Sequence, residues 1–96
     1  MQQYKNFIDG KWIESESKET IKVDDPATGK VFAEIACAKK TEVDQAVQAA
    51  KNSFVSRVLV DMPLLERAKL MHNIADETRK IANEGGKILC YENGKL

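Results

Sequence analysis

Hydrophobic and polar residues alternate in short runs over the first third of the chain, which is typical of strands with one buried face. Two β-prone runs flank Asp9-Gly10 within residues 6–13 and predict a hairpin, because both residues tolerate the positive φ of a tight turn. Residues 14–19 predict a polar surface loop, and residues 20–23 and 30–36 predict two further strands. We therefore expect an antiparallel β element before any helix.

The segment Asp25-Pro26-Ala27-Thr28-Gly29 predicts a turn between the last two of these strands. Pro26 presets φ, Asp25 can accept a local backbone hydrogen bond, and Gly29 can adopt a positive φ. These three properties favour a tight reversal, so the flanking strands are expected to pair.

The hydrophobic period changes to that of a helix after Thr41. Thr41 and Asp44 occupy the N-cap and N3 positions of a weak capping box, which predicts the start of the helix there. The apolar side chains of this helix share one face. They are Val43, Ala46, Val47, Ala50 and Phe54.

A second helix is expected to begin at Pro63, because the missing N–H of proline costs little in a first helical turn. It is predicted to reach Glu84 and to end at Gly85-Gly86. Residues 87–91 are compatible with a helical turn or a strand. The predicted fold class is α+β, with β-hairpins followed by two helices. The apolar stripe of the second helix comprises Leu64, Ala68, Met71, Ala75 and Ala82, widened by Leu70, Ile74 and Ile81.

Composition narrows the possible partners. Hydrophobic residues make up 43% and charged residues 31% of the 96 positions, which is typical of a single globular domain. Fifteen basic residues balance fifteen acidic ones, so no net charge attracts nucleic acid or an anionic membrane. The first eleven residues have no long apolar run, so they predict neither a signal peptide nor a transmembrane helix, and we expect a cytoplasmic domain.

The residues that could carry chemistry have simpler structural interpretations. Cys37 and Cys90 are expected to be small core thiols, and His72 is expected to lie at a helix surface or edge, since no acid–base partner is evident. Asp24-Asp25 together with Glu92 could hold a hard cation, although turn capping accounts better for Asp25. The glycines do not form a phosphate-binding loop.

The order of the motifs nevertheless resembles the N-terminal segment of the NAD(P)-dependent aldehyde dehydrogenase superfamily. Five segments carry this resemblance in the order of the family: residues 7–12 (FIDGKW), 25–31 (DPATGKV), 43–54 (VDQAVQAAKNSF), 63–68 (PLLERA) with 74–76 (IAD), and 92–95 (ENGK). The sequence departs from the family pattern at Arg57, at the pair Gly85-Gly86 and at Leu96.

The resemblance implies that residues 1–96 are the N-terminal part of a Rossmann-type cofactor-binding domain, and an incomplete domain. The nucleophilic thiol, the general base and the NAD or NADP contacts of the family lie downstream of this segment. The resemblance therefore assigns no catalytic or cofactor-binding residue here, and neither Cys37 nor Cys90 matches the nucleophile. It implies one partial site, in which the backbone oxygen of Asp24 and the carboxylate of Glu92 bind a monovalent cation.

Three hypotheses follow for the role of the chain. The leading one is an inactive scaffold fragment of an aldehyde-oxidising enzyme. The others are a small homo-oligomeric interaction module without catalysis, and one subunit of a split enzyme. In the first, the apolar helix faces are expected to be exposed in the isolated chain, where self-association or rearrangement would cover them. The expected partner is a second copy of the chain or the missing remainder of the enzyme. No cofactor is expected to bind this chain alone.

Overall fold

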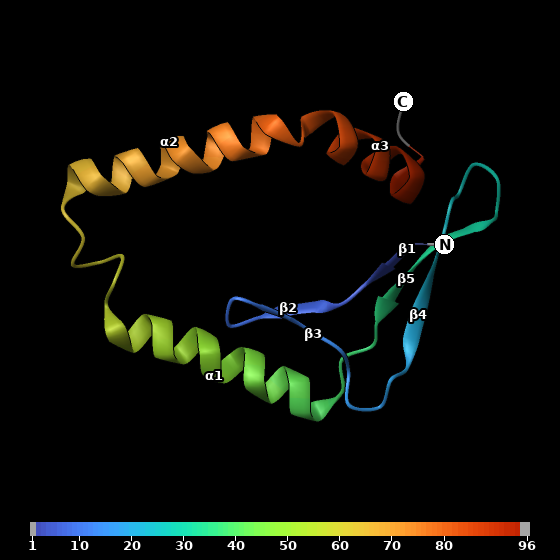
Figure 1. Cartoon of the computed structure of the whole chain (residues 1–96), viewed down its shortest axis with the longest axis horizontal. Coiled ribbons are helices and arrows are strands. Elements are labelled where there is room, and N and C mark those ends of the chain that lie inside the picture. Colours follow the sequence, from blue (N-terminus) through green and yellow to red (C-terminus); the bar gives the residue numbers. More distant parts are fainter. Residues whose placement is uncertain (1, 95–96) are drawn as a thin grey trace.

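The computed structural model describes residues 2–94, so Lys95 and Leu96, which the resemblance invoked, lie outside the described residues (Figure 1). Strands precede helices, as predicted, but residues 2–94 contain three helices where two were expected. The elements are β1 (Gln2–Tyr4), β2 (Asn6–Ile8), β3 (Lys11–Ile13), β4 (Thr20–Asp24), β5 (Val31–Ala36), α1 (Lys40–Ser56), α2 (Leu64–Lys80) and α3 (Ala82–Asn93).

The predicted hairpin is formed by β2 and β3, which pair in antiparallel register with Asn6 opposite Ile13. Asp9 and Gly10 have φ values of 52° and 75°, so both residues adopt the positive φ that a tight turn of this kind requires. Phe7 and Trp12 face each other across the hairpin with ring centroids 4.9 Å apart and in an edge-on arrangement. The hairpin prediction is confirmed.

The strands β4 and β5 pair in antiparallel register around the predicted turn. Asp25 Oδ1 accepts a hydrogen bond from the Ala27 N–H at 2.9 Å, and Gly29 has a φ of 71°. Strand β1 was not predicted. It pairs in parallel with β5, so the three-stranded sheet has the order β1-β5-β4. This pairing joins Gln2 to Ala33, and local periodicity carries no information about so distant a partner.

The N-terminus of α1 differs from the prediction by two residues. The N-cap is Lys39 rather than Thr41, and Glu42 rather than Asp44 occupies the N3 position. The Glu42 carboxylate accepts a hydrogen bond from the Lys39 N–H at 3.1 Å. Asp44 instead forms an ion pair with Lys40 Nζ at 2.6 Å on the helix surface. The earlier start is set by Glu42, which has a buried partner that Asp44 lacks.

The predicted end of the second helix at Gly85-Gly86 is wrong. Helix α2 ends at Lys80, Ile81 forms the break with a φ of −107° and a ψ of 10°, and α3 runs through both glycines. Ala82, assigned from the sequence to the second helix, therefore begins α3. Each glycine weakens a helix by roughly 1 kcal/mol relative to alanine, which is too little to stop one that packs on a sheet. Residues 87–91, whose sequence is compatible with a helical turn or a strand, are helical.

Tertiary packing holds α3 in place at its C-terminal end. The rings of Phe32 on β5 and Tyr91 on α3 lie 5.7 Å apart. Gly94 ends the helix with a φ of 70° and approaches Pro26, since a Cβ atom on Gly94 would lie 3.2 Å from the Pro26 Cγ. The end of α3 therefore lies against the turn between β4 and β5.

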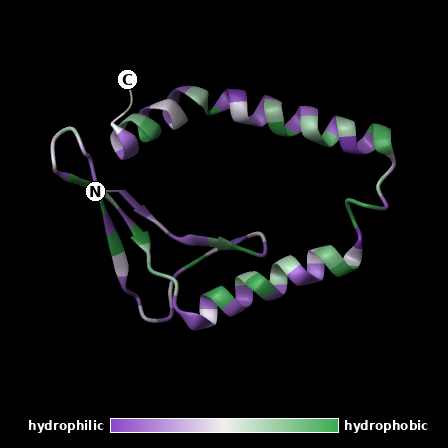
Figure 2. Ribbon diagram, turned by 180° about the vertical axis from the view of Figure 1, so that it is seen from behind, coloured by the Kyte–Doolittle hydropathy of each residue, from purple (hydrophilic) through white to green (hydrophobic). Residues whose placement is uncertain are grey.

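The chain forms a thin plate with almost no interior. It measures 48 × 34 × 16 Å, and its radius of gyration of 17.0 Å exceeds the value of about 12.5 Å for a compact chain of this length. Among residues 2–94, Ala33 is the only buried hydrophobic residue. Figure 2 shows hydrophobic residues along all three helices, and the expected exposure of the apolar helix faces is confirmed.

Candidate functional site

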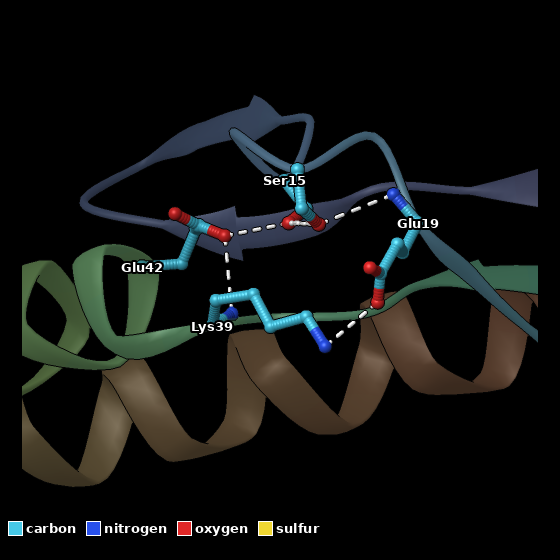
Figure 3. A network of polar contacts seen from close by, with 5 residues as sticks. Ser15, Glu19, Lys39 and Glu42 are labelled. Atoms are coloured by element: carbon cyan, nitrogen blue, oxygen red, sulfur yellow. Dashed lines mark hydrogen bonds and ion pairs between the residues drawn. The ribbon is translucent and has the colours of Figure 1, made fainter.

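A buried polar contact joins the loop after β3 to the start of α1 (Figure 3). Ser15 and Glu42 are each only 2% exposed. The Ser15 hydroxyl donates to Glu42 Oε1 at 2.7 Å, and the Lys39 N–H donates to the same oxygen. These bonds favour the ionised carboxylate, the serine more than the backbone, and they lower the pKa of Glu42 below its ordinary value of 4.5.

A second contact secures the same loop from its other end. Lys39 Nζ lies 2.7 Å from Glu19 Oε2, and the Cys37 N–H donates to the Glu19 carbonyl oxygen at 2.9 Å. The Glu19 carboxylate, followed by the Cys37 side chain, raises the pKa of Lys39 above its ordinary value of 10.5. We call the four residues Ser15, Glu19, Lys39 and Glu42 the loop latch.

The loop latch was not predicted from the sequence, which indicated only a polar surface loop over residues 14–19. No local signal identifies it, because Ser15 and Glu42 are 27 positions apart. The latch fixes the loop between β3 and β4 against α1. All of its contacts join polar groups of the chain to one another. We therefore interpret the loop latch as a structural contact rather than a reaction centre.

The residues predicted to bind a cation lie on neighbouring elements. Asp24 ends β4 beside an irregularity in the strand register, and Glu92 lies in the last turn of α3. Helix α3 contacts β4, and Gly94 approaches Pro26, so the structure brings the two segments to the same edge of the plate. Both residues are exposed. Among residues 2–94, no group of three or more His, Cys, Asp or Glu side chains is placed to hold a metal ion.

The three other candidates for chemistry lie on separate elements. Cys37 is half-buried directly after β5, whereas Cys90 is exposed on α3, so the burial expected for Cys90 is wrong. Its apolar neighbours in the sequence are themselves exposed, because α3 has no layer packed on its outer side. His72 lies exposed on α2, as predicted. Because Cys37, His72 and Cys90 lie on separate elements, they do not form an acid–base pair.

A groove of about 340 Å³ separates α3 from the three-stranded sheet. Aromatic rings contribute to its wall, with Tyr4 and Phe32 on the sheet and Tyr91 on the helix. Its charged residues are balanced, since two lysines (Lys30 and Lys87) accompany two carboxylates (Asp25 and Glu84). The groove consequently offers no preference for an anionic or a cationic ligand.

Helices α1 and α2 expose apolar side chains that no other part of the described chain covers. On α1, Val43 is 50%, Val47 62% and Phe54 82% exposed; we call these three residues the α1 face. On α2, Leu64, Met71 and Ile74 are at least half exposed and form the α2 face. Exposed apolar surface of this extent marks an interaction site in a native protein. These faces are therefore the strongest candidate for a functional surface.

Several known proteins are similar to this chain in both sequence and fold. The sequence profile of the aldehyde dehydrogenase family matches residues 12–96. Malonate-semialdehyde dehydrogenase 1 of Geobacillus kaustophilus is 40% identical over 91 residues, which cover 95% of this chain and 18% of that protein. Malonate-semialdehyde dehydrogenase of Bacillus pumilus is 36% identical over 95 residues, or 99% of this chain and 19% of that protein.

Among solved structures, a mutant aldehyde dehydrogenase from Bacillus cereus superposes with a TM-score of 0.88 and 31% sequence identity. The superposition covers 98% of this chain and 19% of that one. The chain thus spans about a fifth of the length of the proteins it matches. Within residues 2–94, no helix has the length and apolar content needed to cross a membrane.

Proposed function

Because the chain belongs to the aldehyde dehydrogenase family, we propose that it forms the N-terminal part of the cofactor-binding domain of an NAD(P)-dependent enzyme of that family. One observation carries this proposal. Almost the whole chain, 98% of it, superposes on a fifth of an aldehyde dehydrogenase with a TM-score of 0.88. A segment that keeps its fold so closely is expected to keep its place in the complete architecture.

In this proposal the chain is a scaffold and the reaction takes place elsewhere. The family reaction, oxidation of an aldehyde to a carboxylic acid with NAD(P)⁺, is assigned to the remaining four-fifths of the architecture. The placement of Cys37, Cys90 and His72 on separate elements, where they form no acid–base pair, supports this division. The chain alone binds no NAD(P) and is inactive. The names of its relatives favour malonate semialdehyde as the substrate of the complete enzyme, which we place in the cytoplasm.

The proposal includes a structural cation site at the edge of the plate. The backbone oxygen of Asp24 and the Glu92 carboxylate would supply two oxygen ligands to a monovalent cation. The contact between α3 and β4 and the approach of Gly94 to Pro26 support this assignment, because they bring both segments to one edge. Further ligands would come from the rest of the enzyme.

A chimera tests the proposed function. This chain replaces the 91 matched residues of the Geobacillus kaustophilus enzyme, and reduction of NAD⁺ is measured with malonate semialdehyde. We expect aldehyde-dependent activity that approaches that of the parent enzyme, because the two segments share a fold. The parent enzyme is the positive control, and a variant that lacks the segment is the negative control. A folded chimera without activity would contradict the proposal.

A further inference from the structure

We draw no further inference here: the strongest candidate, the exposed apolar surface made up of the α1 face and the α2 face, carries none because nothing in the structure shows what covers it.

Discussion

The Ser15 hydroxyl donates a hydrogen bond of 2.7 Å to Glu42 Oε1, and both side chains are buried in a molecule with almost no other interior. Their contact joins a loop of the β-rich part to the first turn of α1. The orientation of this helix relative to the sheets therefore depends on a polar contact more than on a hydrophobic core. The first two predictions concern this relationship.

Ser15→Ala is expected to destabilise the chimera, because it leaves the buried Glu42 with one donor fewer. Loss of one such bond lowers the melting temperature by roughly 2–6 °C. Differential scanning calorimetry of the chimera measures this shift. Ser17→Ala is the comparison in the same loop and should shift the melting temperature less, since exposed Ser17 bonds the Ser15 hydroxyl and accepts from the Glu19 N–H without a direct contact to Glu42. A melting temperature unchanged by Ser15→Ala would show that the loop latch contributes nothing to stability.

Glu42 is expected to make the free energy of unfolding decrease at acid pH. Folding lowers the pKa of this carboxyl, so its contribution is fully present above the unfolded value near 4.5 and is lost as the pH falls through the folded value. Glu42→Gln should flatten the acid limb of the stability curve, measured by urea unfolding between about pH 3 and 7. The control is Glu16→Gln, on an exposed residue of the same loop. An acid limb equally steep in Glu42→Gln would assign the pH dependence to other carboxylates.

The sequence identifies local structure in this chain better than long-range structure. Asp9-Gly10 encodes its own turn, because the positive φ values that it needs are a property of those two residues. The parallel pairing of β1 with β5 and the contact between Ser15 and Glu42 each join positions about thirty residues apart. Neither leaves a periodic or compositional signal.

The glycine pair shows why a local signal can also mislead. Gly85-Gly86 indicates a helix end when propensity is considered alone. In the structure Ile81 breaks the helix instead, and the packing of Tyr91 on Phe32 supports α3 beyond both glycines. The predicted cation ligands, Asp24 and Glu92, depend on a resemblance and on the contact between α3 and the sheet. Their motif could be recognised in the sequence, but the contact between α3 and β4 that brings their segments to one edge could not.

Replacing Gly85 or Gly86 by alanine should stabilise the chimera. Both glycines have helical backbone angles, and a Cβ atom at either position would meet nothing within 4 Å. Each substitution is expected to raise the free energy of unfolding by up to about 1 kcal/mol, mainly because alanine has less conformational freedom to lose. Urea unfolding followed by circular dichroism measures the change.

Gly94→Ala provides the opposite expectation within the same helix. Its φ of 70° disfavours any side chain, and its Cβ would crowd the Pro26 ring at 3.2 Å. This variant should lower stability, by about 1 kcal/mol or more. If Gly85→Ala and Gly94→Ala changed stability in the same direction, the assignment of helical and left-handed conformations to these residues would be wrong.

Removal of monovalent cations should destabilise the chimera if Asp24 and Glu92 share a bound ion. An ion that binds only the folded state raises its stability as its concentration increases. The melting temperature is therefore expected to fall when potassium and sodium are replaced by choline at constant ionic strength, because choline is too large for a site of close oxygen ligands. Glu92→Gln should remove most of this dependence. The control is Glu84→Gln, on an exposed carboxylate near the other end of α3. A cation dependence that persisted in Glu92→Gln and vanished in Glu84→Gln would place the ion elsewhere on the plate.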